Sequence, residues 1–590
     1  MESGNEKQKM LTILATSDLH GKFYPWNYAQ NENDLSGSMA QLLPAIRERY
    51  HKEDTILVDA GDTIQDNAAE IFLDEKIHPM IAALNYLGYD VWTSGNHDYN
   101  FGLDETKRCI EGFAGKALIG NVYERSGRPL ADGYTILERG GIRVAVIGMV
   151  TPNIDRWDRA NLAGCRVTDP VEETGRILEK IDGQYDVLIG ALHMGLRNEY
   201  GRPDSGIDDF TRAFPQFDLI VGAHEHFRIE GQVINGVIVV ENREQAQTMC
   251  EVTLTLSPES GSEGTAECAE ERCETGLKTG RKWRVTDRKV RMIDVSTYEP
   301  DGEFLRAFAP YHERAVRDAE KAVGVLEGGP LVPPDEIKGI PTAQIQDTAL
   351  SDLINEVQLY YSGADVSACC LYDLDANIQP GPIRKCDVAH IYKHPNTLVK
   401  LKMTGAQLKR YMEWSARYYN TFRAGDLTVS FNPEIRAYSY DIFSGVNYEI
   451  DISREAGSRI RNLCWPDGRP VQDAEELTVA VSNYRYAAQL SAPGEVYSEN
   501  EALPVLMESE VSSYIGGIRE LIMDYIVIAK DRVIIAKTDH NWRLTGMDWD
   551  PALHQRVAEL AAAGLLKIEA SANGRTPNIR PVREEDLLGL

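Results

Sequence analysis

The stretch Thr55-Ile-Leu-Val-Asp-Ala-Gly-Asp62 decides how the rest of the sequence is interpreted. Its apolar first half is typical of a strand buried on both faces, and its Asp-Ala-Gly-Asp ending predicts a tight turn. Gly61 lets the backbone turn sharply, so Asp62 is expected at the carboxyl end of the strand. Taken alone, Asp62 is more simply explained as a cap of the following helix. A further role for Asp62 depends on the residues at the ends of the other strands.

Apolar runs of the same kind alternate with helical patterns between residues 11 and 260. The runs are LTILATSD (11–18), TILVDAGD (55–62), YDVWTSGNHD (89–98), KALIGNV (116–122), IRVAVIGMV (142–150), YDVLIGALH (185–193), FDLIVGAHEH (217–226) and GVIVVEN (236–242). Helices are expected between several of them, at 39–50, 79–87 and 170–181. This alternation predicts an α/β layered domain, closed by an antiparallel strand at MCEVTLTLS (249–257).

A second α/β domain is expected after the Gly- and Pro-rich stretch GGPLVPP at 328–334, where we place the domain junction. A helix is predicted before this junction, at 301–323. After it the predicted helices lie at 348–361 and 405–418, and the predicted strands at 397–403, 445–452 and 476–483. The resulting domains are 10–295, a helix and linker at 296–340, 341–546, and a C-terminal extension at 547–590 with one amphipathic helix near 552–563.

Length and composition set the class of protein. A chain of 590 residues exceeds one hydrophobic core, and 43% hydrophobic with 26% charged residues is ordinary for a soluble globular protein. The formal net charge of -29 argues against a nucleic-acid polymer as partner. It does not exclude a small nucleotide, because metal ions can reverse the local field.

Apolar runs and cysteines bear on the compartment. No run reaches ~18 apolar residues, so no membrane span is expected, and MESGNEKQKM lacks the apolar core of a signal peptide. The nine scattered cysteines favour reduced thiols in a cytoplasmic protein, although Cys268 and Cys273 could pair. The alternative is a secreted or cell-wall protein whose signal was removed. The oligomeric state stays open.

Metal-binding side chains follow several of the predicted strands. The segments are Ser17-Asp18-Leu19-His20-Gly21, Gly61-Asp62, Gly95-Asn96-His97-Asp98, Leu192-His193 and Gly222-Ala223-His224-Glu225-His226. The carboxyl ends of parallel strands share one edge of a sheet, so five loops would deliver these side chains to one crevice. Five of the 12 histidines of the chain lie at these ends. We therefore expect a dinuclear metal site.

The spacing of these residues allows an assignment. Asp18 and His20 are two residues apart and can reach one cation, whereas His224 and His226 can each point to a different one. Asp62 has two oxygens and can join the pair. A mixture of His, Asp and Asn suits two divalent ions such as Mn, Zn, Fe or Co better than Ca or Mg. A pair of ions ~3.5–4 Å apart can generate a hydroxide near neutral pH and hold a phosphoryl oxygen.

The order D-x-H-G, G-D, G-N-H-D/E, H and G-x-H-x-H resembles the calcineurin-like metallophosphoesterase superfamily. The resemblance implies a four-layer α/β/β/α domain. It implies a first metal on Asp18, His20, Asp62 and His226, and a second on Asp62, Asn96, His193 and His224. His97 would steady the transition state or protonate the leaving oxygen, which contributes ~10²–10⁴-fold. Many relatives have an Asp three residues after this histidine. Asn100 occupies that position here, and it can orient the His97 ring but not stabilise a charged imidazolium as a carboxylate would.

The second half of the chain resembles the carboxyl-terminal nucleotide-binding domain of the 5′-nucleotidase family. The matching segments are I-Y-K-H-P-N-T-L at 391–398, T-G-A-Q-L-K-R-Y-M-E-W-S-A from 404, G-V-N-Y-E-I-D from 445, S-N-Y-R-Y from 482 and N-W-R-L from 541. The resemblance implies that His394 and Tyr484 enclose the base, with Arg485 as a candidate contact to sugar or base. The alternative for Tyr484 is a core residue of a strand face.

Within that family the bifunctional 2′,3′-cyclic-nucleotide 2′-phosphodiesterase/3′-nucleotidases are the most similar branch. The 5′-nucleotidase branch carries N-G-G-x-R, or a near variant, where this chain has Ser367-Ala-Cys-Cys-Leu-Tyr372, without an arginine. We therefore expect metal-dependent hydrolysis of 2′,3′-cyclic nucleotides and 3′-nucleotides to nucleoside and phosphate, with no membrane or nucleic-acid partner. The alternatives are a 5′-nucleotidase or nucleotide-sugar hydrolase with the same site, and a non-catalytic nucleotide-binding protein.

Overall fold

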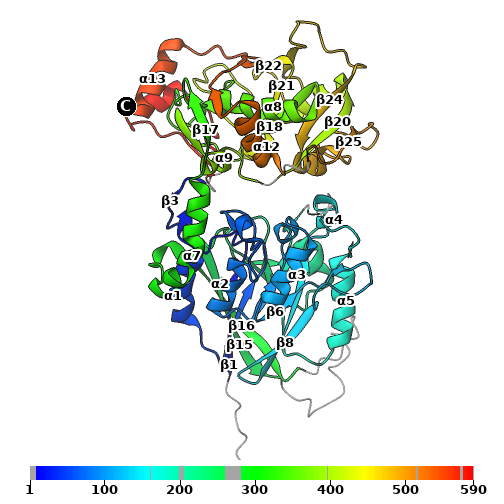
Figure 1. Cartoon of the computed structure of the whole chain (residues 1–590). Helices are drawn as coiled ribbons and strands as arrows, with labels where there is room; N and C mark the ends of the chain where they lie inside the picture. The colour runs from blue at the N-terminus through cyan, green and yellow to red at the C-terminus, as the bar shows by residue number, and fades with distance from the viewer. Residues whose placement is uncertain are drawn as a thin grey trace, which may run out of the picture. The chain divides into compact units, whose positions relative to one another are not determined.

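The chain divides into two compact units, Met1–Arg317 and Asp318–Leu590. The computed structural model describes residues 8–159, 161–197, 199, 205–259, 281–394, 396–512, 516–571, 574 and 576–588. Cys268 and Cys273, for which the sequence left a disulfide open, lie outside these residues. Figure 1 colours the chain by residue number, so that the elements of each unit can be followed separately.

The first unit contains two six-stranded sheets. The first has the order β16-β15-β1-β4-β5-β6, and its strands are β1 (Lys9–Thr16), β4 (Thr55–Asp59), β5 (Val91–Thr93), β6 (Lys116–Leu118), β15 (Thr248–Pro258) and β16 (Trp283–Asp294). The second has the order β13-β14-β12-β11-β9-β8, and its strands are β8 (Tyr134–Arg139), β9 (Ile142–Val150), β11 (Val187–His193), β12 (Leu219–Gly222), β13 (Ile229–Ile234) and β14 (Val237–Glu241).

The two sheets pack face to face, with helices on their outer faces. Leu11 and Ile56 of the first sheet share one buried core with Val144 and Ile189 of the second. The opposite face of the first sheet packs on α1 (Met39–Arg49), α2 (Pro79–Leu87) and α7 (Gly302–Ala319). That of the second packs on α5 (Pro170–Ile181) and α6 (Ile207–Ala213). The predicted α/β/β/α layering is thus confirmed.

Local chemistry explains where the outer helices begin and end. Pro170 occupies the first turn of α5, where its missing N–H costs nothing, and the Asp169 carboxylate accepts from two backbone amides of that turn. Helix α2 also begins at a proline, and it ends at Gly88, whose φ of 82° suits a left-handed C-cap. These signals are local, and the sequence prediction at 79–87 and 170–181 has the same bounds as the observed helices.

One expectation about the first unit was wrong. The sequence analysis placed all five metal-site loops on one edge of one parallel sheet. In the structure three of the loops follow β1, β4 and β5 of the first sheet, and the others end β11 and follow β12 of the second. Strand patterns fix neither pairing partners nor the number of sheets, because any buried parallel strand has the same apolar run.

The second unit is built on a five-stranded sheet with the order β21-β18-β24-β20-β25. Its strands are β18 (Val366–Cys370), β20 (Leu398–Thr404), β21 (Asp441–Ser444), β24 (Glu476–Ser482) and β25 (Val505–Glu508). Two three-stranded sheets accompany it: β23-β22-β27, with β22 (Asn447–Asp451), β23 (Ile460–Cys464) and β27 (Trp542–Thr545), and β19-β17-β26, with β17 (Ala322–Glu327), β19 (Gly381–Arg384) and β26 (Val533–Ile535). Helices α8 (Ala349–Ser362) and α10 (Gly405–Ala416) pack into the two cores of this unit.

The unit boundaries differ from those expected. The chain divides after Arg317 and not at 328–334, because β17 already pairs with β19 and β26 of the second unit. The expected extension at 547–590 is part of the second unit's core, since Val557 and Ala561 of α13 (Pro551–Ala562) and Val582 beyond it are buried there. The predicted amphipathic helix near 552–563 had an apolar face to bury, but the sequence did not show which core that face would join.

Across the described residues, every helix is too short or too polar to cross a bilayer.

Candidate metal centre

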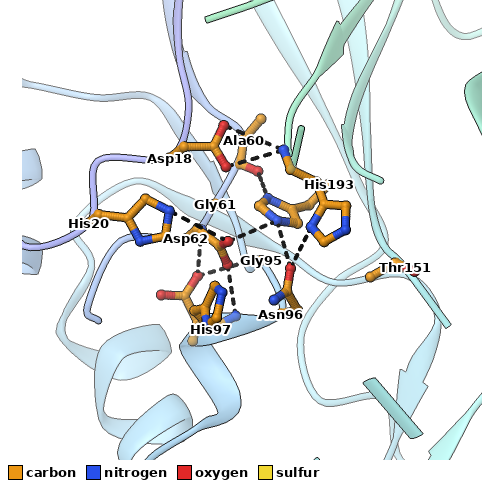
Figure 2. A network of polar contacts seen from close by, with 12 residues as sticks. Asp18, His20, Ala60, Gly61, Asp62, Gly95, Asn96, His97, Thr151 and His193 are labelled. Carbon is orange, nitrogen blue, oxygen red and sulfur yellow. Dashed lines mark hydrogen bonds and ion pairs between the residues drawn. The ribbon is translucent and has the colours of Figure 1, made fainter. Parts of the chain in front are cut away.

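The five predicted loops of the first unit converge. Figure 2 shows labelled side chains from four of them facing one another. The residues that they bring together are Asp18, His20, Asp62, Asn96, His97, His193, His224 and His226. Asp62 lies at the centre of this group. The resemblance assigns all of these residues except His97 to two metals. The distances between their side chains in the structure can be compared with that assignment.

The first group of ligand atoms belongs to Asp18, His20, Asp62 and His226. One ligand atom from each of these side chains lies within 4.8 Å of the others. The Nε2 atoms of His20 and His226 face each other at 3.2 Å, and His226 Nε2 lies 3.5 Å from an Asp18 oxygen. Nitrogen lone pairs that converge with carboxylates in this way have the composition of a transition-metal site.

The second group comprises Asp62, His193 and His224, again with ligand atoms within 4.8 Å of one another. His193 Nε2 lies 3.2 Å from Asp62 Oδ2 and 3.1 Å from the side-chain oxygen of Asn96. His224 Nδ1 lies 2.8 Å from the same Asn96 oxygen. Because Asp62 belongs to both groups, its carboxylate is placed to join two cations.

Neighbouring acceptors fix which nitrogen two of the histidines, His193 and His226, present to the centre. His193 Nδ1 donates to the backbone oxygen of Ala60 at 2.7 Å, and His226 Nδ1 donates to Glu244 at 2.8 Å. Each bond leaves Nε2 as the nitrogen that points into the group, which is the usual arrangement around a bound metal. The residues present therefore fit a pair of divalent ions.

The protonation states of Asp62 and His193 depend on each other. Burial raises the pKa of the Asp62 carboxyl, but His193 and His97 hold it well below its ordinary value. Burial lowers the pKa of His193, yet the ionised Asp62 and its hydrogen bond raise that pKa to about 10. Without a cation, a proton on His193 therefore balances the charge of Asp62. Because metal ligands must be deprotonated, a cation held by His193 would displace that proton.

Backbone strain is concentrated at these residues. Asp18, His20, Asp62, His224 and His226 have φ between 43° and 85°, a left-handed conformation that costs about 1–3 kcal/mol for a residue other than glycine. Each lies in a turn directly after a strand, where the reversal of the chain aims the side chain at the centre. Such strain persists only where the surrounding structure enforces it.

Asp98 holds two of the loops together, a role that the sequence analysis did not assign. It is 1% exposed, and its carboxylate accepts from the backbone amides of Asp62, Thr63, Ile64 and Gly95 at 2.8–3.1 Å. The turn that carries Asp62 is thereby fixed to the turn that carries Asn96. A carboxylate directly after Gly-Asn-His was the available signal, but nothing in the sequence shows its four donors.

His97 lies beside Asp62, and its backbone amide donates to Asp62 Oδ1 at 2.8 Å. Its ring Nδ1 lies 2.7 Å from Asn100 Oδ1, as expected for a residue that orients the ring. Asn100 in turn donates from Nδ2 to Asp158 at 2.8 Å. The sequence analysis did not find Asp158, which lies far from the motif in the chain.

The predicted substrate residues of the second unit lie near one edge of its main sheet. Leu398 pairs with Ser482, so the segments that carry His394 and Tyr484 run close together, and the Thr397 and Asn483 backbones are hydrogen bonded. His394 packs edge-on against Tyr372, with ring centroids 4.6 Å apart. Tyr484 is 39% exposed and lies in the short helix α11 (Asn483–Arg485) after β24, so it is not a core residue of a strand face.

Arg485 occupies a different environment from the one expected of a substrate contact. It is 3% exposed, and its Nε lies 2.7 Å from Asp441 Oδ2. Its Nη2 donates to Asp441 Oδ1 at 3.1 Å and to the backbone oxygen of Tyr438. The guanidinium is thus engaged inside the protein, which argues against direct contact with a ligand. An exposed Arg and a buried, paired Arg look alike in a sequence.

Two packed sheets between helices, with a carboxylate shared by two groups of His, Asp and Asn ligands, define a metal-dependent phosphoesterase domain. Sequence comparison gives the same class: residues 11–228 match the calcineurin-like phosphoesterase family, and residues 330–490 match the 5′-nucleotidase C-terminal domain. The chain therefore joins a calcineurin-like phosphoesterase domain to a 5′-nucleotidase C-terminal domain.

Several named proteins resemble this chain over most of its length. It is 25% identical to the trifunctional nucleotide phosphoesterase protein YfkN of Bacillus subtilis, over 92% of this chain but only 39% of that longer protein. It is 24% identical to the 2′,3′-cyclic-nucleotide 2′-phosphodiesterase/3′-nucleotidase of Yersinia enterocolitica, over 91% of this chain and 88% of that protein. The crystal structure of a 5′-nucleotidase precursor from Thermus thermophilus shares the fold, with a TM-score of 0.55 and 17% identity over 92% of this chain and all of that one.

Proposed function

We propose that the protein hydrolyses phosphate esters of nucleotides at a dinuclear centre, with 2′,3′-cyclic nucleotides and 3′-nucleotides as its preferred substrates. The observation that carries the proposal is the position of Asp62 in both groups of ligand atoms. The name of the Yersinia relative supports this choice of substrate. The lack of an arginine at 367–372 also supports it, and most of this segment belongs to the buried strand β18.

In this proposal seven side chains hold two divalent ions of the Mn, Zn, Fe or Co class: Asp18, His20, Asp62, Asn96, His193, His224 and His226. When bound, such ions supply Lewis acidity toward water and toward phosphoryl oxygens. His97 lies beside Asp62 and delivers a proton to the leaving oxygen. In the second unit, Tyr484 and His394 stack on the base.

A substrate panel tests the proposal. The purified protein with added Mn²⁺ should turn over 2′,3′-cyclic AMP and 3′-AMP with a higher kcat/KM than 5′-AMP or a nucleotide sugar. Faster turnover of 5′-AMP would assign the protein to the 5′-nucleotidases instead. Failure to hydrolyse any of these compounds or p-nitrophenyl phosphate, with metal bound, would reject the enzyme and favour a nucleotide-binding protein.

The role of Tyr484 can be separated from that of the metal centre. Loss of one stacked aromatic side chain costs ~1–3 kcal/mol per base, so Tyr484→Ala should lower kcat/KM for 3′-AMP by roughly 5- to 150-fold. Hydrolysis of p-nitrophenyl phosphate, which has no base, should stay unchanged. Tyr360→Ala, which removes another exposed tyrosine of the same unit, is the matched control. An equal loss with both substrates would remove Tyr484 from the base-binding role.

A further inference from the structure

A chain of hydrogen bonds runs from His97 away from the metal centre to a buried carboxylate. His97 Nδ1 lies 2.7 Å from Asn100 Oδ1, and Asn100 Nδ2 lies 2.8 Å from Asp158 Oδ1. Asp158 follows helix α4 (Ile154–Trp157) and is only 8% exposed. It also faces the amide of Asn161 at 3.4 Å, and that same amide donates to the backbone oxygen of Asn100 at 3.0 Å. These bonds hold the side chains of His97, Asn100 and Asp158 in one arrangement.

The direction of each hydrogen bond follows from the chemistry of the Asp158 carboxylate, at the end of the chain of bonds. An ionised carboxylate only accepts, so the NH₂ group of Asn100 must face Asp158. The carbonyl oxygen of Asn100 must then face His97, and His97 Nδ1 must carry the proton of their bond. Burial raises the pKa of Asp158, and the bond from Asn100 opposes that rise because it stabilises the ionised form. Without Asp158, the two ends of the Asn100 amide could exchange places.

The fixed direction has a consequence for proton transfer. With Nδ1 always protonated, Nε2 is the one ring nitrogen of His97 that can gain or lose a proton. Within the described part of the chain, His97 Nε2 has no hydrogen-bond partner, so it is free to meet a substrate oxygen. A reversed Asn100 amide would place an N–H against Nδ1 and force the proton onto Nε2 of the neutral ring. That neutral form could release its Nε2 proton only by becoming an imidazolate anion, so it cannot deliver a proton to a leaving oxygen.

We propose that Asp158 is a positioning residue, which acts through Asn100 to hold His97 in the tautomer with a proton on Nδ1. Asn100 has no charge of its own. The carboxylate of Asp158, which is hydrogen bonded to Asn100 and not to the ring itself, supplies that charge. The kinetic part of this inference rests on the proposed function, in which His97 delivers a proton. The tautomer itself does not depend on any substrate.

The direct test is the tautomer of His97 in the full-length protein loaded with Zn²⁺, which is diamagnetic. Histidine ¹⁵N shifts distinguish a protonated Nδ1 from a protonated Nε2, and the spectrum of His97→Gln identifies the signals of His97. We expect the wild-type protein to show a protonated Nδ1. A neutral His97 with its proton on Nε2 would overturn the proposal without any variant of Asp158.

Variants then test whether Asp158 is the cause. Asp158→Asn offers either end of an amide to Asn100, so the Nδ1–H signature should weaken and kcat should fall at least ~10-fold with little change in KM. The double variant Asn100→Asp/Asp158→Asn exchanges carboxylate and amide, which restores the direction of both bonds and should recover most of the lost kcat. Asp155→Asn removes an exposed carboxylate of the same segment and is the matched control.

The outcomes are distinguishable. An unchanged tautomer in Asp158→Asn, or a double variant no more active than the single one, would refute the role of Asp158. A tautomer that shifts as expected in a protein that hydrolyses no nucleotide would support the role of Asp158 and reject the proposed function. Metal content and the thermal unfolding midpoint of each variant show whether a lost activity reflects a lost fold.

Discussion

Gly95→Ala is the substitution whose effect the structure predicts most sharply. An added Cβ at Gly95 would lie 2.1 Å from Asp62 Oδ1 and 2.5 Å from both Asp62 N and His193 Cε1. Real Cβ contacts do not approach closer than 3.0 Å. The carboxylate that joins the two ligand groups must therefore move by nearly 1 Å, or the turn after β5 must move away from it.

A misplacement of about 1 Å at a reacting centre costs about 10²-fold, or about 2.7 kcal/mol of activation free energy. We expect kcat/KM of Gly95→Ala for p-nitrophenyl phosphate to fall at least that far, and bound metal measured by mass spectrometry to decrease. The control is Gly175→Ala in helix α5, where the nearest atom is Phe214 Cζ at 3.9 Å. It should keep full activity and add roughly 0.5–1 kcal/mol of stability, because alanine favours the helix. Wild-type kcat/KM with full metal content in Gly95→Ala would refute the packing argument.

Two further predictions concern carboxylates outside the ligand set. Asp98→Ala removes the acceptor of four buried backbone amides. The free energy of unfolding should therefore fall by at least ~1–3 kcal/mol, and metal affinity should fall with it. Urea unfolding that matches the wild type would contradict this prediction. Asp352 of the second unit has its pKa raised to about 8 by burial and by the charge of Asp347. A pKa raised on folding means that stability falls as pH rises from about 4 to about 8, by at most about 1.4 kcal/mol per unit. In EDTA, Asp352→Asn should therefore be more stable than the wild type at pH 8 but not at pH 4. If the unfolding free energies of the two proteins changed with pH in parallel, Asp352 would not titrate as described.

The sequence sufficed for those features that short stretches of chain encode by themselves. An apolar run with a turn after it predicted the strand end before each of the five loops of the candidate metal centre, and the structure brings the side chains of the loops together. Helices α2 and α5 had the expected bounds because a proline, a cap or a glycine marks each end. The α/β layering follows from the alternation of these elements.

Features that depend on distant partners could not be predicted. The loop after β5 and the end of β11 belong to different sheets, and only their packing brings Asn96 to His193. Asp158 and Asn100 are 58 residues apart, so no motif connects them. Arg485 was expected at the substrate, but its burial with Asp441 depends on a strand 44 residues away. Pairing across such distances is set by the folded chain as a whole.

Metal stoichiometry tests the central claim most directly. The claim is that the Asp62 carboxylate holds two cations where loops from two sheets meet. After loading with Mn²⁺ and removal of free ions, the wild-type protein should retain two ions per chain. Asp62→Ala should retain fewer and should not hydrolyse p-nitrophenyl phosphate. A wild-type protein without bound metal, or an Asp62→Ala variant that retains both ions and full turnover, would contradict the account.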